Sequence, residues 1–401
     1  MVMQPNNPEA ILAKRTHEKA ASVWSQPPTF KLSNTEDQLK LETLIDNRES
    51  ADLPPLQCHD PLDIVTRELF EHNHPEHRGD RDKLLEFQAE ALNQGVEFGT
   101  WVVFPWSGIL SRFPDREDYR QLRTSRNRNL ITDEEQAVLF DARIAVLGLS
   151  VGSKAVEALV ESGIGGEYVL ADNDQIEATN LNRLSAGYTD LGNHKADNAA
   201  IGISEKDPWI DITLLRDGLT VETAREISDC DLIVEEMDNL PAKALARITA
   251  RDHQVPLVMA ADIGKKSVVD IERYDTEDAA KIIFNGKIDE NQAALLASGE
   301  VSHAENMRLM ARHTGLKHLT KRLMDTVTLI GTKVNGIPQL GMTATRGGTN
   351  IAYAAEDILL GRELPSGRYV DSPRSVYRQS REHSLVETVK SAINLKKHLS
   401  Q

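Results

Sequence analysis

A buried strand that leads through a glycine turn into a helix constrains the fold of this chain most strongly. Ile144–Leu147 is a short apolar run without alternation, which is typical of a parallel strand buried on both faces. Gly148-Leu149-Ser150-Val151-Gly152-Ser153 follows as a tight turn, and apolar residues then recur at helical spacing between Ala155 and Val160. Since parallel strands need crossover connections, this pattern predicts an α/β domain.

The strand-and-helix pattern continues along the chain. Tyr168–Asp172, Leu232–Val234 and Pro256–Ala260 are further apolar runs, and Pro241–Asp252 has helical spacing between the last two. Such alternation predicts a doubly wound, mostly parallel sheet of the Rossmann-like type. Outside this region we expect helices at Pro8–Val23 and Asp82–Leu92, a strand within Gly99–Trp106, and a long helix within Gly336–Ser366 that ends at Leu359-Leu360-Gly361.

The glycine turn is suited to a nucleotide. A helix that begins at such a turn points free amides and a positive dipole end at a phosphate. Asp172 lies 20 residues after Gly152 at a strand end, where a carboxylate can accept hydrogen bonds from ribose hydroxyls. The competing interpretation of these residues alone is a tight turn with an incidental aspartate.

Two cations and a second carboxylate make the prediction more specific. Arg183 offers a planar fork to phosphate oxygens and Lys195 a point charge, although each alone is as compatible with a solvated surface. Asp238 follows the third apolar run, where one carboxylate plus phosphate oxygens suits Mg²⁺; its alternative role is to cap the helix entering at Pro241. Together the cations indicate a triphosphate.

These positions resemble the ThiF/MoeB/HesA superfamily, the adenylating relatives of ubiquitin-activating enzymes. The resemblance covers about residues 120–365. It rests on the following elements: Gly148-x-Ser150-x-Gly152, Asp172-x-Asp174, Asn180-x-x-Arg183, Gly192-x-x-Lys195, Asp238-Asn239, the upstream Arg123-Thr124-Ser125-Arg126-Asn127 and the helix ending at Gly361. The Asn-x-x-Arg element with its spaced lysine is the most specific of these.

The resemblance implies a role for each matching position. Gly148 and Gly152 would admit ATP, Asp172 would hold the ribose with Asp174 nearby, and Asn180, Arg183 and Lys195 would bind the phosphates. Asp238 would carry Mg²⁺, and Arg126 would enter the active site of a partner subunit, which implies a homodimer. The family's reaction is the attack of a substrate carboxylate on the α-phosphate, giving an acyl adenylate and pyrophosphate.

Three departures from the family pattern refine this expectation. The turn reads Gly-Leu-Ser-Val-Gly-Ser instead of Gly-x-Gly-Gly-x-Gly. The zinc-binding CxxC pairs of many relatives are absent, so no zinc is expected. Cys58 and Cys230 are the chain's two cysteines, and Cys230 is interpreted as a small apolar filler, so no thioester nucleophile is evident. Relatives of this kind, such as MccB-like and TcdA-like enzymes, pass the acyl adenylate directly to an acceptor.

The charge balance limits the partners. The chain has 62 acidic and 46 basic residues and a formal charge of −16, which disfavours nucleic acid as a partner. No stretch predicts a signal peptide or a membrane span, so a cytoplasmic protein is expected. We therefore expect a carboxylate substrate that is a peptide or a small amino-acid-like acid.

Two histidine groups and one glycine pair have weaker interpretations. His72-Asn73-His74-Pro75-Glu76-His77 can bind a metal but is more typical of a surface loop. His303, His313 and His318 lie in the charged stretch Glu300–Met324 and are either bases acting on the adenylate or residues of solvated helix faces. Arg346, Gly347, Gly348 and Thr349 are placed before the last helix, as a candidate anion site.

The predicted organisation has four parts: an N-terminal accessory α+β region (1–115) of unassigned role, an ATP-binding adenylation core (116–275), a crossover insert over the substrate (276–330), and the C-terminal part of the adenylation domain with its tail (331–401). Two alternatives stay open. An NAD(P)- or FAD-binding oxidoreductase explains the glycines and Asp172 but gives no role to the cations. A catalytically silent scaffold is consistent with the altered glycine turn.

Overall fold

The computed structural model describes residues 23–51, 53–276, 282–377 and 385–398. The predicted helix at Pro8–Val23 lies outside these ranges except for Val23. The strands are β1 (Thr29–Phe30), β2 (Gln57–His59), β3 (Thr100–Phe104), β4 (Ile109–Phe113), β5 (Arg143–Leu147), β6 (Glu167–Ala171), β7 (Asp211–Leu215), β8 (Leu232–Glu235), β9 (Leu257–Ile263), β10 (Lys266–Glu272) and β11 (Gly367–Asp371). The α-helices are α2 (Thr35–Ser50), α3 (Leu62–Asn73), α4 (Arg81–Gln94), α5 (Arg116–Arg123), α6 (Asp133–Asp141), α7 (Gly152–Glu161), α8 (Lys195–Lys206), α9 (Leu240–Asp252), α10 (Glu290–Ala297), α11 (His303–Thr314), α12 (Lys321–Val327), α13 (Gly341–Leu359), α14 (Pro373–Tyr377) and α15 (Leu385–His398).

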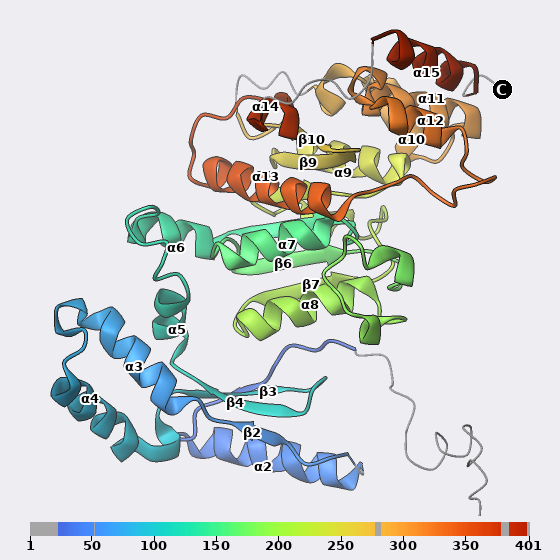
Figure 1. Ribbon diagram of the computed structural model, residues 1–401. Helices are drawn as coiled ribbons and strands as arrows, with labels where there is room; N and C mark the ends of the chain where they lie inside the picture. The colour runs from blue at the N-terminus through green and yellow to red at the C-terminus, as the bar shows by residue number, and fades with distance from the viewer. Residues whose placement is uncertain (1–22, 52, 277–281, 378–384, 399–401) are drawn as a thin grey trace, which may run out of the picture.

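A seven-stranded sheet forms the centre of the molecule, in the order β11-β10-β9-β8-β5-β6-β7 (Figure 1). The five strands from β9 to β7 pair in parallel, and β10 and β11 add an antiparallel edge. The chain order reverses at β5, which pairs with β6 on one side and β8 on the other. The predicted doubly wound, mostly parallel sheet is therefore confirmed, and β5 is its topological switch point, where such sheets bind ligands.

Alternate residues of each strand pack against helices on opposite faces of this sheet. Ile144 and Val146 belong to the core under α7, α8 and α13, whereas Ala145 and Leu147 belong to the core under α9 and α10. Because both faces are covered by helices, the strands carry apolar residues on both sides, which explains the unalternating runs in the sequence.

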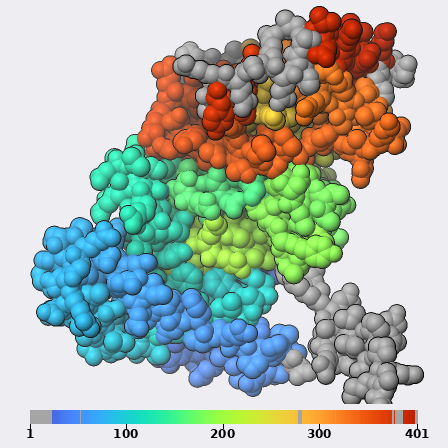
Figure 2. Space-filling view, viewed as in Figure 1, coloured from blue at the N-terminus to red at the C-terminus, as the bar shows by residue number. Residues whose placement is uncertain are grey.

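A second, four-stranded sheet lies in the N-terminal part, in the order β1-β3-β4-β2. Phe30, Leu41, Trp101 and Val103 form its small core with α2. In Figure 2 the described N-terminal part, blue to cyan, forms a lobe below the green part of the central domain. This lobe agrees with the expected N-terminal α+β region, while the four proposed domain boundaries stay a prediction.

Aromatic residues of the N-terminal part hold α8. Trp24 donates from its backbone amide to Asp197 (2.7 Å) and from its indole to Ser204 (2.9 Å). Trp106 donates to Glu205 (2.9 Å), and the hydroxyl of Tyr119 donates to the carbonyl of Lys206. We call these three aromatic residues the α8 clamp.

One expected helix boundary is wrong. Arg346–Thr349 lies inside α13, not before it. A Cβ atom on Gly348 would lie 2.4 Å from the carbonyl of Lys154, so the glycine permits α13 to pack against the backbone of α7. The helix does end as predicted, because Gly361 follows it with φ +66°. No helix within the described residues is long and apolar enough to cross a bilayer.

Candidate nucleotide site

The first turn after β5 requires glycine at its first position. Gly148 has φ +87°, and a Cβ atom there would lie 2.7 Å from the carbonyl carbon and oxygen of Glu236 at the end of β8. Gly152 opens α7, where a Cβ atom would meet Val146 at 3.3 Å. No side chain caps this helix end. Its first amides therefore face the carboxyl end of the sheet, where they can bind an anion.

Asp172 and Lys195 join the end of β6 to the turn. One oxygen of Asp172 accepts the amide of Leu149 (2.7 Å) and the other accepts the amide of Asp174 (2.9 Å). The ammonium of Lys195, at the first residue of α8, is 2.7 Å from Asp174 and 3.8 Å from Asp172. Each carboxylate oxygen keeps a second lone pair, so Asp172 can still accept a ribose hydroxyl.

The loop with Asn180 and Arg183 is internally braced. Asn180 is buried and accepts the amide of Glu177 (3.0 Å), and Arg183 donates to the carbonyl of Thr179 and to Asn182, both at 3.0 Å. The Nε of Arg183 is buried with no partner in the described structure. Burial lowers the pKa of Arg183, and Asp262 opposes this shift. A donor left without an acceptor fits an anionic ligand at this position.

Asp238 and Arg126 are both exposed. Asn239, not Asp238, caps α9 by accepting the amide of Ala242 (3.2 Å), which leaves the carboxylate of Asp238 without a partner among the described residues. Arg126 lies between α5 and α6 and likewise has no ion pair or hydrogen bond in that part of the chain. Both side chains are therefore available to a ligand or to a second subunit.

A carboxyl pair was not anticipated from the sequence. Glu236, just after β8, accepts the amide of Ala260 (2.5 Å), and Asp262 follows two residues later on β9. Both oxygens of Asp262 are buried and unpartnered in the described structure, as are Ser150 Oγ in the first turn and Arg346 Nη1 in α13. Unused polar atoms therefore occur in the turn, in the Arg183 loop, in β9 and in α13.

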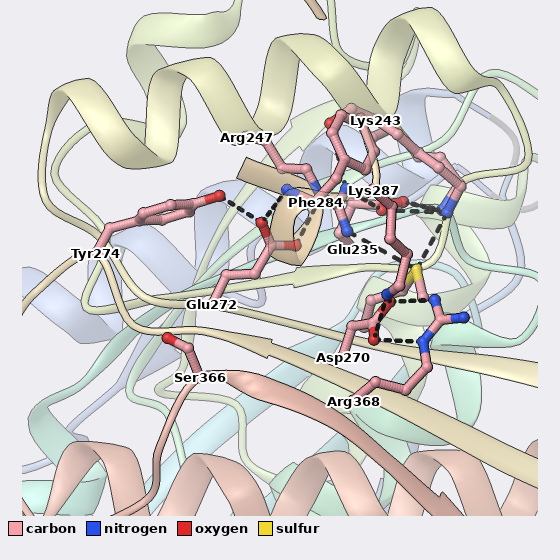
Figure 3. A network of polar contacts seen from close by, with 12 residues as sticks. Glu235, Lys243, Arg247, Asp270, Glu272, Tyr274, Phe284, Lys287, Ser366 and Arg368 are labelled. Carbon is pink, nitrogen blue, oxygen red and sulfur yellow. Dashed lines mark hydrogen bonds and ion pairs between the residues drawn. The ribbon is translucent and has the colours of Figure 1, made fainter. Parts of the chain in front are cut away.

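A network of buried charges lies behind the site, under α9 (Figure 3). Arg247, which is fully buried, donates to Glu235 and to Glu272, both at 2.7 Å, and lies 4.3 Å from the ring centre of Phe284. Lys243 contacts both oxygens of Glu235, at 2.9 and 3.1 Å. Burial alone would raise the pKa of Glu235, but the two cations outweigh it and hold the pKa below its usual range.

This network fixes the loop that carries Asp238. Glu235 also accepts the amide of Met237 (2.9 Å), and its carboxylate is itself held by Lys243 and Arg247. The first residues after β8 are therefore fixed to the buried network. Asp172 plays the same part after β6 by accepting the amide of Asp174. The loop after β6 and the loop after β8 each contain a predicted ligand-binding residue, and a carboxylate at the end of the strand anchors each loop.

The other singled-out residues divide as follows. His313 is buried against Phe284, with ring centres 5.1 Å apart, and does not lie on a solvated face. Its burial lowers its pKa well below 6.5, and the nearby cations Arg247 and Lys243 lower it further. The sequence signal for this burial was the position of His313 four residues after the apolar Leu309.

Cys230 is buried, as predicted. Among the described residues no three metal-ligating side chains converge, His72–His77 included. A cavity of about 710 Å³ near Tyr274 and Leu364 is lined by none of the predicted site residues.

Known proteins are similar to this chain over its central segment. The ThiF family model matches residues 124–347, more than half of the chain. An uncharacterized protein of Mycobacterium tuberculosis, MT1398, is 35% identical over 272 residues, which is 67% of this chain and 37% of that protein. The tRNA threonylcarbamoyladenosine dehydratase of Bacillus subtilis is 30% identical over 169 residues, 40% of this chain and 66% of that enzyme.

The chain thus spans about a third of the first relative and just under two thirds of the second. Among solved structures, the E. coli dehydratase TcdA aligns with 65% of this chain and 97% of its own, at 22% identity and a TM-score of 0.41, and it has also been solved with ATP bound. The family match rests on the segment that holds the glycine turn, Arg183, Lys195 and Asp238, and the chain belongs to the ThiF family.

Proposed function

We propose that the protein is an ATP- and Mg²⁺-dependent adenylyltransferase that activates a substrate carboxylate as an acyl adenylate. The observation that carries the proposal is the convergence of anion-binding groups at the switch point of the sheet. The free amides of α7, the buried ammonium of Lys195 and the unpartnered Nε of Arg183 come from three segments. A dinucleotide site would use the amides of α7 but would give Lys195 and Arg183 no phosphate to bind.

The charges suit adenylation. Attack of a carboxylate on the α-phosphate builds negative charge on phosphorus oxygens and on the leaving pyrophosphate, where Arg183 and Lys195 stabilise it most. The nucleophile is already an anion, so this step needs no base. Asp238 would hold Mg²⁺, which supplies further charge neutralisation between the phosphates when bound.

The acyl group is proposed to pass to its acceptor without an enzyme thioester. Burial raises the pKa of the Cys230 thiol to about 12, which removes its thiolate at neutral pH. Cys58, the other cysteine, lies in β2 of the N-terminal sheet, apart from the nucleotide-binding sheet. The preferred substrate remains a peptide or a small amino-acid-like acid.

The test is calorimetric titration with ATP plus Mg²⁺, and separately with NAD⁺, NADP⁺ and FAD. Asp238→Ala should weaken Mg²⁺-dependent ATP binding at least ~10-fold, about 1.4 kcal/mol. Asp211→Ala is the matched control. Asp211 is also exposed, but it is the first residue of the outer strand β7 and so lies at the amino end of the parallel strands, away from the loop of Asp238. Binding of a dinucleotide alone would move the protein to the oxidoreductases, and ATP binding without pyrophosphate exchange for any acid would favour a silent scaffold.

We also propose a homodimer in which Arg126 enters the partner's site. The support is that Arg126 is exposed on a loop and has no ion pair or hydrogen bond within the described part of its own chain. Arg126→Ala and Arg183→Ala should each abolish pyrophosphate exchange. Subunits mixed in equal amounts should recover about a quarter of the wild-type rate, since half of the dimers then carry one intact site. No recovery would mean that each site is built from one chain.

A further inference from the structure

Asp262 is a carboxylate without hydrogen-bond donors. Both of its oxygens are shielded from solvent, and neither has a partner within the described structure. Buried carboxylates normally accept several hydrogen bonds or an ion pair, because an ionised group is costly to bury unsatisfied. By comparison, the carboxylate of Asp172 receives two backbone amides and a nearby ammonium. The unused oxygens of Asp262 therefore indicate that a ligand supplies the donor.

The position of Asp262 places it beside the expected nucleotide site. It lies near the carboxyl end of β9, opposite Ser267 of β10. A Cβ atom on Gly347 of α13 would lie 3.7 Å from its Oδ1, so a glycine leaves room beside the carboxylate. The guanidinium of Arg183 acts on it electrostatically but forms no ion pair with it. Asp262 thus stands beside the residue expected to bind the phosphates.

The surroundings of Asp262 are acidic. Glu236, whose amide-accepting carboxyl joins β8 to β9, interacts with Asp262, and burial raises the pKa of Glu236 well above its usual range. Burial also raises the pKa of Asp262 to about 7, with Arg183 opposing the rise. A carboxyl group of this kind gains a proton readily from a donor that binds next to it.

We propose that Asp262 receives the proton of an amine acceptor in the transfer step, and that its two unpartnered oxygens select an amine over an alcohol or a thiol. This inference rests on the proposed adenylation. The neutral form of a primary amine attacks, and it offers two N–H donors for the two unpartnered oxygens of Asp262, whereas an alcohol or a thiol offers one donor. The acceptor class would then be a primary amine on a small molecule or a peptide.

The transfer step balances as follows. The amine nitrogen forms a bond to the acyl carbon, and the bond from that carbon to the phosphate oxygen breaks. The electron pair of this bond leaves with AMP, and one proton passes from nitrogen to Asp262 Oδ and then to water. Adenylate formation itself moves no proton, so the carboxyl group is used in the second half of the reaction alone.

The experiment separates the two halves. A panel of dipeptides and N-acetyl amino acids is screened by ATP–pyrophosphate exchange with the full chain, and the best acid is then used with glycinamide or hydroxylamine as acceptor. Hydroxylamine is largely unprotonated at pH 7.5 and attacks adenylates without a base. Asp262→Asn should keep exchange and hydroxamate formation within about 3-fold but slow amide formation at least ~100-fold.

Asp371→Asn is the matched control. This carboxylate lies on the outer strand β11, which β10 separates from β9, and it is paired with Arg346 (3.3 Å), so its loss should not change the ratio of amide to hydroxamate. A melting curve at pH 8 checks folding of Asp262→Asn. The variant should be no less stable than the wild type there, because it removes a buried charge.

Each outcome is decisive. Selective loss of amide formation supports the assignment. Equal loss of exchange, hydroxamate and amide makes Asp262 a structural residue and overturns it. A wild-type enzyme that forms hydroxamate but no amide overturns the amine class. No exchange with any acid together with no ATP binding refutes the adenylation itself, and this inference with it.

Discussion

Replacing Arg247 by methionine should destabilise the protein by about 4 kcal/mol. The guanidinium makes two charge-assisted hydrogen bonds of 2.7 Å, to Glu235 and to Glu272, and all three side chains are at most 1% exposed. Each such bond contributes about 1.5–3 kcal/mol, and breaking a buried ion pair from one side typically costs about 3–5 kcal/mol. Methionine fills much of the volume, so most of the loss comes from the two carboxylates left behind.

The assay is urea unfolding followed by circular dichroism, with Arg251→Met as the matched control. Arg251 lies one helical turn later on α9 and pairs with Asp252 and Glu290, whose side chains are 53% and 72% exposed. Exposed pairs contribute at most about 1 kcal/mol. The double variant Arg247→Met/Glu272→Gln should recover part of the loss, since one unpaired charge is removed with the cation. Equal effects of Arg247→Met and Arg251→Met would refute the reasoning.

Two further predictions follow from the turn and from the buried histidine. Gly148→Ala should destabilise the protein by about 2 kcal/mol or more and abolish ATP binding in calorimetry, because its Cβ would collide with Glu236; Gly202→Ala, with nothing within 4 Å of its Cβ, should instead stabilise α8 by about 0.5–1 kcal/mol. His313 has a folded-state pKa well below 6.5, so the unfolded chain binds the extra proton and stability falls as the pH drops below 6.5, by up to about 1.4 kcal/mol per pH unit. His313→Leu should flatten this dependence in melts from pH 7.5 to 5.5; an unchanged slope would assign it to other groups.

The sequence predicted the parts of the site that are local in the chain. The β5 strand, the Gly148 turn and α7 follow one another, so their pattern is readable without a partner. The role of Asp262 depends on Gly347 and Arg183, which approach it from distant segments, and no periodicity encodes that encounter.

The errors have a related cause. The expectation that Gly347 and Gly348 precede α13 is wrong, because Gly348 is needed inside α13 where the helix meets the backbone of Lys154. For His313, which lies in a charged stretch of the sequence, the alternatives were a base acting on the adenylate and a solvated helix face. The apolar face that it shares with Leu309 buries it.

The α8 clamp links residues that precede the family match to the helix that carries Lys195. Lys195 is the first residue of α8, and Trp24, Trp106 and Tyr119 hold that helix between Asp197 and Lys206. All three precede residue 124, where the family match begins. The lysine that we propose to bind phosphate is thus held in place by residues that lie outside the family match. Slow amide hydrogen exchange along α8 would be a property of the whole chain, lost when residues 1–123 are removed.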